Sequence, residues 1–230
     1  MPVFPDKITP NVSYGSRIKA YAVGLVHGHF VSLERTAQII RDQYNIYPSN
    51  GTVQNWINEA QAQLLPMYQQ CAQTIVHSPV AHFDESGVRV NGKLNWLHVA
   101  ATSNAVYYSV HTTRGQGGID AANILPQFTG CAVHDHWRAY WRYAQATHAL
   151  CNAHHLRELL YVAELTGHDW PLAIKKLLIE GKKAVELAQA QGLMAVPLEQ
   201  IESFSKRYDE CIANGLLMCP VKRSYHADKR

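Results

Sequence analysis

The hydrophobic pattern begins with helical spacing. From Ser16 to about Gln43, and again from Thr52 to about Leu65, apolar residues recur on one face of an expected helix. The intervening NIYPSNG contains the proline and glycine that break helices, and Ser32 is suited to cap one. Pro66 should end or kink the second helix, with a further helix to about Val76. Two helices around a tight turn predict a helix-turn-helix-like unit.

After residue 79 the period changes from 3.6 to 2. Three consecutive strands are predicted in VAHFDESGVRV, KLNWLHVAATS and VYYSVHTTR, with a hairpin turn at Asn91-Gly92. The pattern then predicts a helix in GQGGIDAANILPQF, a strand in CAVHD, an aromatic helix in HWRAYWRYA, a strand in THALC and a helix in NAHHLRELLYVAEL. After Gly167 the pattern is wholly helical. Three meandering strands followed by alternating helix and strand predict an α/β protein with a ribonuclease-H-like mixed five-stranded sheet.

This pattern divides the chain into three expected regions. Residues 1–78 form a helical N-terminal region with the helix-turn-helix-like unit. Residues 79–166 form a partial ribonuclease-H-like catalytic core. Residues 167–230 form a C-terminal all-helical insertion segment and a basic tail.

Charge argues against tight binding of nucleic acid by the whole surface. Lys and Arg number 21 and Asp and Glu 18, and the last ten residues, VKRSYHADKR, account for the excess of +3. The second helix of the helix-turn-helix-like unit has no Lys or Arg, although Gln54, Asn55 and Asn58 are able to bind adenine edges. The alternative interpretation is a helical hairpin that packs on its neighbours and does not bind DNA. We expect weak, salt-sensitive and mostly non-specific DNA binding.

Cysteine usage and hydropathy favour a cytoplasmic protein. The 5 cysteines are odd in number and widely spread, which is not a disulfide framework. The N-terminus has no apolar signal-peptide core, and no apolar run approaches the length of a membrane span. Hydrophobic residues make up 47%, enough for a substantial core.

Two aspartates are the main candidates for chemistry. Asp84 lies within the first predicted strand, and Asp135 ends the fourth. These two strands are neighbours in a ribonuclease-H-like sheet, so the carboxylates should meet on one edge. Carboxylates that share two Mg²⁺ ions activate water or a 3′-hydroxyl and stabilise the leaving oxygen.

Three blocks of sequence resemble the transposases of insertion-sequence family 66: FDESGVRVNGKLNWLHVAATS, AVHDHWRAYWRY and HALCNAHHLREL. The resemblance covers about Tyr14 to Leu165. It implies a two-metal Asp-Asp-Glu transposase, with Mg²⁺ or Mn²⁺ as cofactor, that cuts and joins DNA at the ends of an insertion sequence. It assigns the first two acids to Asp84 and Asp135, and it allows further transposase subunits as partners.

The third acid of the family is missing from this sequence. The family has it in an Asn-Asn-x-x-Glu-Arg motif after a helical insertion, and the last 70 residues contain no such motif. Glu158, on the helix after the fifth strand, is a weaker candidate, since it could equally pair with Arg157 or Tyr161 on that helix. The resemblance therefore implies a shortened transposase that is inactive alone.

Other residues support further contacts and alternative functions. His136, Trp137, Arg138 and Arg142 are candidates for contact with nucleic acid, although aromatic clusters more often pack a helix on a sheet. Cys151-x-x-His154 and Cys131-x-x-His134 have zinc-like spacing, but Cys131 and His134 would lie on opposite faces of a strand. The alternatives are a non-enzymatic DNA- or partner-binding module and a zinc-stabilised domain.

Overall fold

The computed structural model describes residues 13–220. The predicted basic tail, residues 221–230, lies outside the described residues. The chain forms two compact units. The N-terminal unit contains the described residues up to Ile75 together with Ala105–Tyr107, and the sheet unit contains Val76–Asn104 and the described residues from Tyr108.

Three helices build the N-terminal unit: α1 Ser16–Val23, α2 Leu33–Tyr44 and α3 Asn50–Val76, of which the last residue lies beyond this unit. A short π-helix, Gly24–Gly28, follows α1. The Ser32 side chain accepts a hydrogen bond from the backbone N–H of Arg35, as its predicted capping role requires. The core consists of five buried residues from the three helices: Ala22, Ala37, Ile40, Val53 and Trp56.

The helix α3 continues through Pro66, so the proline does not end the helix, which was one of the two predicted outcomes. A proline inside a helix removes one backbone hydrogen bond and leaves the carbonyl four residues earlier without its partner. Both Pro66 and Ala62, whose carbonyl is affected, are exposed to solvent. Water can therefore satisfy this carbonyl. Leu64, expected on the buried face, is also exposed.

The sheet unit contains a mixed five-stranded sheet in the order β3-β2-β1-β4-β5. The strands are β1 Val80–Val90, β2 Lys93–Ala101, β3 Val106–His111, β4 Cys131–His134 and β5 Thr147–Leu150. The first two residues of β3 are counted in the N-terminal unit. β2 is antiparallel to β1, whereas β4 is parallel to β1 and β5 is parallel to β4. The α/β class and the mixed five-stranded sheet predicted from the sequence are thereby confirmed.

Alternation along β1 separates a buried face from an exposed one. Ala81, Phe83 and Glu85 are buried, whereas His82 and Asp84 are exposed. Phe83 packs edge-to-face against Phe128, with the ring centroids 5.5 Å apart. Because successive strand residues point to opposite faces, the apolar members of this alternation bury β1 and leave Asp84 outside.

The segment between β4 and β5 is not the predicted aromatic helix. Only a single 3-10 turn, Tyr140–Arg142, forms there. Tyr140 and Tyr143 are nevertheless buried, so these aromatic residues pack without a helix. Between β3 and β4 the predicted helix is also shorter than expected. It forms α4 Gln116–Ala122 and a 3-10 turn, Leu125–Gln127.

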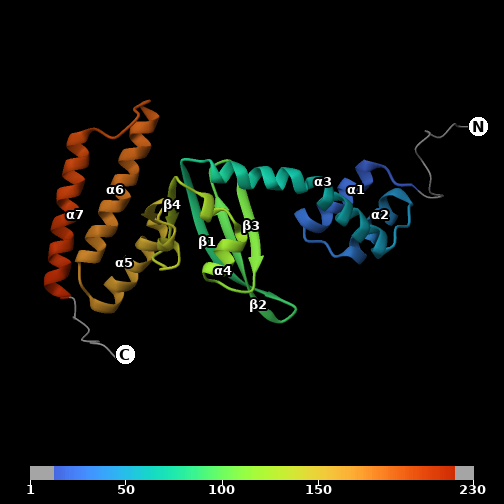
Figure 1. Ribbon diagram of the computed structural model, residues 1–230, viewed down its shortest axis with the longest axis horizontal. Helices are drawn as coiled ribbons and strands as arrows, with labels where there is room; N and C mark the ends of the chain where they lie inside the picture. Colours follow the sequence, from blue (N-terminus) through green and yellow to red (C-terminus); the bar gives the residue numbers. More distant parts are fainter. Residues whose placement is uncertain (1–12, 221–230) are drawn as a thin grey trace, which may run out of the picture. The chain divides into compact units, whose positions relative to one another are not determined.

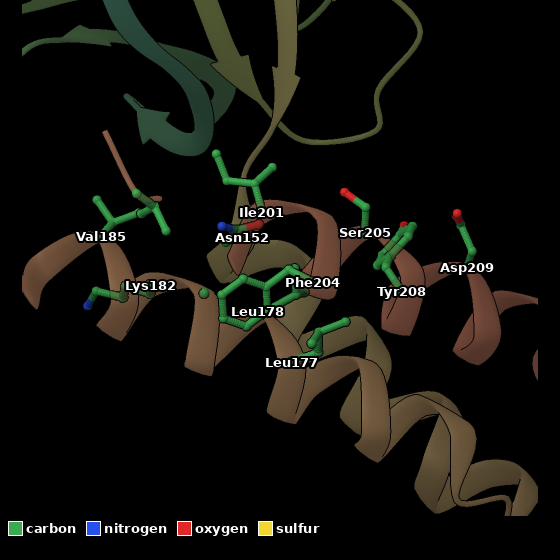
Figure 2. Close-up of a pocket in the computed structure, with 12 residues that line it drawn as sticks. Asn152, Leu177, Leu178, Lys182, Val185, Ile201, Phe204, Ser205, Tyr208 and Asp209 are labelled. Atoms are coloured by element: carbon green, nitrogen blue, oxygen red, sulfur yellow. The ribbon is translucent and has the colours of Figure 1, made fainter. Parts of the chain in front are cut away.

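Three helices follow β5: α5 Asn152–Thr166, α6 Trp170–Ala190 and α7 Leu198–Met218. α6 and α7 lie side by side (Figure 1). A groove of about 750 Å³ lies between them, and Figure 2 shows apolar side chains from both helices around it. Those side chains include Leu177, Val185, Ile201, Phe204 and Tyr208.

Candidate functional site

The two candidate aspartates lie at matching positions on neighbouring parallel strands. The last paired residues are His82 on β1 and Val133 on β4, and Asp84 and Asp135 each follow two residues later, Asp135 just past the end of β4. Asp84 lies on the exposed face of β1. Val133 and Asp135 are on the less buried face of the β4 alternation, whereas Ala132 and His134 are buried. Since neighbouring strands are about 4.8 Å apart, the two carboxylates belong to one edge and one face of the sheet.

Short-range hydrogen bonds orient both carboxylates. Oδ1 of Asp135 accepts from the backbone N–H of Trp137 at 2.9 Å, and Oδ1 of Asp84 accepts from that of Glu85 at 2.9 Å. Within residues 13–220 neither carboxylate forms an ion pair with Lys, Arg or His. Each therefore keeps oxygen lone pairs available for a cation.

A charged network lies on the opposite face of β1. Oε1 of the buried Glu85 accepts a hydrogen bond from Nε of Arg114 and forms an ion pair with its Nη2, and the Tyr140 hydroxyl donates to Oε2. Burial, followed by this bond to Glu85, raises the pKa of Tyr140 above its ordinary value. The Arg114 guanidinium also lies over the Trp137 ring, 4.4 Å from its centroid. The network thus links the strand of Asp84 to the segments that follow β3 and β4.

Two histidines connect the end of β4 to β5. Nδ1–H of His134 donates to the Asp135 carbonyl at 2.6 Å, and Nε2 of His134 shares a hydrogen bond with Nδ1 of His148 at 2.8 Å. His148 in turn donates from Nε2 to the Tyr143 carbonyl at 3.1 Å. Burial lowers the pKa of His134 below its ordinary value. These bonds hold the backbone at Asp135 in a defined conformation.

Glu158 lies close to the residue that follows Asp135. Its Oε2 is 3.0 Å from Nε2 of His136, so its partner is not Arg157 or Tyr161, the helix-surface neighbours considered from the sequence. The rings of His136 and His155 meet edge-to-face, with centroids 4.7 Å apart. Burial, and then His136, lower the pKa of His155. The beginning of α5 thus lies against the segment after β4.

The aromatic and basic candidates differ in exposure. Arg138 is exposed, and Arg142 is exposed while donating a hydrogen bond to Gln116. Trp137 is half-buried between the Arg114 guanidinium and the edge of the Tyr140 ring. The two arginines remain accessible to a phosphate, whereas Trp137 is largely occupied by packing.

The cysteine–histidine pairs do not form a cluster of metal ligands within the described part of the chain. Cys131 and His134 lie on opposite faces of β4, as predicted, and His134 is engaged with Asp135 and His148. No third His, Cys, Asp or Glu ligand joins Cys151 and His154 among residues 13–220. Nδ1 of His154 is buried there without a hydrogen-bond partner.

Several residues of this site were missed from the sequence. Glu85 has a detectable signal, since an acid at a buried position of an alternating strand needs a cationic partner. Its partners Arg114 and Tyr140 have no such signal, because 29 and 55 residues separate them from Glu85. His148 and His155 were likewise not singled out as partners of His134 and His136.

A comparison with models of protein families identifies the family of the chain. The model of the IS66 transposase family matches residues 11–214. The chain belongs to this family. The match confirms the resemblance of the three sequence blocks. No curated protein matches the chain.

Membership of the family has consequences for ligands. IS66 transposases are of the Asp-Asp-Glu type, which binds DNA and generally uses divalent metal ions. Asp84 and Asp135 carry oxygen atoms of the kind that such ions prefer; Asp84 is exposed, Asp135 is half-buried, and neither has a cationic partner among the described residues. Within residues 13–220, none of the helices is long and apolar enough to span a membrane.

Proposed function

We propose that this chain contains the catalytic core of a transposase that cuts and joins DNA at the ends of an insertion sequence. Asp84 and Asp135 are proposed as the first two acids, and the observation that supports them is that each follows, by two residues, the last pair in the parallel register of β1 and β4, His82 and Val133. The strand order, with β2 antiparallel to its neighbour β1 and with β4 and β5 parallel, supports a ribonuclease-H-like core. We also propose a cytoplasmic location, because free cysteines spread along the chain fit a reducing compartment.

In the proposed reaction, both aspartates serve as ligands of the metal ion. They supply carboxylate oxygens to Mg²⁺ or Mn²⁺, which when bound activates the attacking oxygen and stabilises the leaving oxygen. The Trp137 N–H holds one oxygen of Asp135 and leaves the other for the ion. Glu85, although adjacent to Asp84, is committed to Arg114 and Tyr140 on the other face. It therefore does not compete for the same cation.

We assign no catalytic role to Glu158. Its carboxylate is paired with His136, and the family's third acid lies in an Asn-Asn-x-x-Glu-Arg motif that this sequence does not contain. Two-metal phosphoryl transfer requires ligands for both ions. We therefore propose that the 230-residue chain does not transpose DNA without a further segment or subunit that supplies this acid.

Contacts with DNA are proposed for two regions. Near the carboxylates, Arg138 and Arg142 would contact phosphates, with His136 and Trp137 beside them. In the N-terminal unit, α2 and α3 would act as a helix-turn-helix-like element. Its candidate base-reading residues on α3, Gln54, Asn55 and Asn58, are all exposed. We propose weak and mostly non-specific binding, because α3 has no Lys or Arg.

The second candidate function is a non-enzymatic module that binds DNA or a partner, such as another transposase subunit. The open apolar groove between α6 and α7 favours it, since large exposed apolar surfaces are typical of interaction sites (Figure 2). Such a module would not need the two carboxylates to bind a metal. Metal binding therefore separates the two functions.

Titration of the full chain with Mn²⁺ tests the proposed carboxylate site. Asp84→Asn and Asp135→Asn should each weaken binding by about tenfold, because each removes a charged oxygen ligand. Asp42→Asn, at an exposed position of α2, is the matched control and should leave the affinity unchanged. Unchanged affinity in both site variants would favour the non-enzymatic module.

A strand-transfer assay tests the missing acid. The substrate is the terminal DNA of the insertion sequence that encodes the chain, and the protein is supplied with or without a segment bearing the Asn-Asn-x-x-Glu-Arg motif. We expect joining only with the segment. Robust joining by the chain alone that is abolished by Glu158→Gln, but not by Glu164→Gln on the same helix, would identify Glu158 as the third acid.

A further inference from the structure

Three side chains with metal-binding atoms converge beside, but apart from, the two proposed catalytic acids. His136 lies just after β4, while His155 and Glu158 are three residues apart on α5 and so share one face of that helix. Their ligand atoms all lie within 4.8 Å of one another. Among the described residues this is the one such group of His, Cys, Asp or Glu.

The donor atoms of this group differ from those of the aspartate pair. Two imidazole nitrogens and one carboxylate oxygen suit Zn²⁺ and related transition metals, with bonds of about 2.0–2.2 Å. Mg²⁺ instead prefers oxygen ligands throughout. Three protein ligands leave a fourth position for water or another group, as in zinc sites built from two histidines and a glutamate.

An ion pair alone does not account for the arrangement. The contact of 3.0 Å between Nε2 of His136 and Oε2 of Glu158 needs only two residues. His155 is nevertheless directed at His136, with the ring planes at 88° and the centroids 4.7 Å apart. Atoms that ligate one tetrahedral zinc lie about 3.4 Å from each other, as follows from bonds of about 2.1 Å. Small rotations of these partly exposed side chains bring a spread of 4.8 Å to that value.

We propose that His136, His155 and Glu158 form a binding site for Zn²⁺ or a similar transition-metal ion, separate from the carboxylate pair. A bound ion joins the first turns of α5 to the segment that directly follows Asp135. The site uses neither Cys151 nor His154, which are the zinc-like residues by sequence spacing. It also differs from the aspartate pair in selectivity, because its nitrogen donors bind Zn²⁺ in the presence of excess Mg²⁺.

Calorimetric titration of the metal-free full chain with Zn²⁺, in millimolar Mg²⁺, tests the proposal. We expect one ion per chain, with His155→Ala and Glu158→Gln each weakening binding by about 10- to 100-fold or more, since even outer partners of metal ligands have effects of that size. Glu164→Gln is the matched control for α5. The double variant Asp84→Asn/Asp135→Asn should retain zinc binding, so the result does not depend on the proposed catalytic role.

Cobalt replacement provides a second measurement that does not require variants to fold. Co²⁺ bound to the wild-type chain should show visible d–d bands without the near-ultraviolet band of a thiolate ligand. A thiolate band would overturn the proposal. In the calorimetric titration, loss of zinc affinity in Cys151→Ser or His154→Ala but not in His155→Ala would overturn it too. Displacement of Zn²⁺ by millimolar Mg²⁺ would overturn it as well, because it would indicate a site made of oxygen ligands.

Discussion

Oε1 of Glu85 lies 2.7 Å from both Nε and Nη2 of Arg114, and the Nε–H group donates a charge-assisted hydrogen bond to it. The Glu85 side chain is 1% exposed and that of Arg114 is 41% exposed. The pair is therefore buried at its acidic end and open to solvent at its basic end. Replacing the buried Glu85 should therefore change the free energy of unfolding more than replacing the partly exposed Arg114.

Glu85→Gln should destabilise the sheet unit by about 2–3 kcal/mol, because it leaves Arg114 without its buried anion. This loss of stability is smaller than for a fully buried ion pair, because water screens the charge of Arg114. Urea denaturation followed by circular dichroism measures the change. Glu186→Gln, which breaks the exposed pair with Lys182, is the control and should change stability by less than about 0.5 kcal/mol. Equal effects of the two variants would contradict the structural role of Glu85.

Replacement by alanine should change the stability of the protein in opposite directions at two glycines. A Cβ at Gly118 would lie 2.2 Å from Nε2 of His98 and 2.4 Å from the Thr113 carbonyl oxygen. Gly118→Ala should therefore destabilise the sheet unit by about 1–3 kcal/mol through overpacking. A Cβ at Gly181, inside α6, would have nothing within 4 Å, so Gly181→Ala should stabilise by about 0.5–1 kcal/mol. Thermal denaturation of both variants distinguishes these signs, and an unchanged midpoint for Gly118→Ala would show that α4 does not approach His98 and Thr113 this closely.

The Tyr140 hydroxyl predicts a loss of stability in alkali. Because its pKa is raised in the folded state, the unfolded chain releases this proton first as the pH rises. The stabilisation is therefore fully present below the ordinary value of 10.0 and is lost progressively above it. Tyr140→Phe should cost about 1–2 kcal/mol at pH 8 and reduce the further loss at higher pH. Denaturation curves of the wild type and the variant, recorded at pH 8 and at a pH above the ordinary pKa of tyrosine, test this. Tyr161→Phe, at an exposed site of α5, is the control.

The exposed arginines near Asp135 predict a change in the salt dependence of DNA binding. Arg138→Ala and Arg142→Ala should each weaken binding and reduce the slope of log affinity against log salt by about one. Fluorescence anisotropy between about 50 and 200 mM salt measures the slope. Arg207→Ala is the matched control, because Arg207 on α7 is paired with Glu180. An unchanged slope in both site variants would place the DNA contacts elsewhere on the chain.

The strands and their order were predictable because their signals are local. Alternation and the Asn91-Gly92 turn identify β1 and β2, and the turn has the expected positive φ at both residues, 49° and 78°. The division into three regions, the metal ligands and the DNA contacts stay predictions. They depend on ligands and partners, which a hydrophobic pattern does not encode.

Other features could not be read from spacing alone. Trp137, Tyr140 and Tyr143 recur every three residues, which resembles a helix face, but their rings are held by Arg114, Glu85 and Asp120 from other elements. Tertiary contacts thus replaced the helix with a single 3-10 turn. The pairing of His136 with Glu158 has the same origin, because it joins segments separated by β5.

The alternation of buried and exposed residues along β1 determines how this strand responds to insertion or deletion of residues. Asp84 and Glu85 are adjacent acids with opposite surroundings, one exposed beside Asp135 and the other enclosed by Arg114 and Tyr140. Removing or adding one residue just before them would exchange the two faces, bringing the longer acid outward and the shorter one against Arg114. A change of two residues would restore the faces but move both acids by about 6.6 Å along the strand. This strand should therefore accept conservative substitutions far more readily than any insertion or deletion.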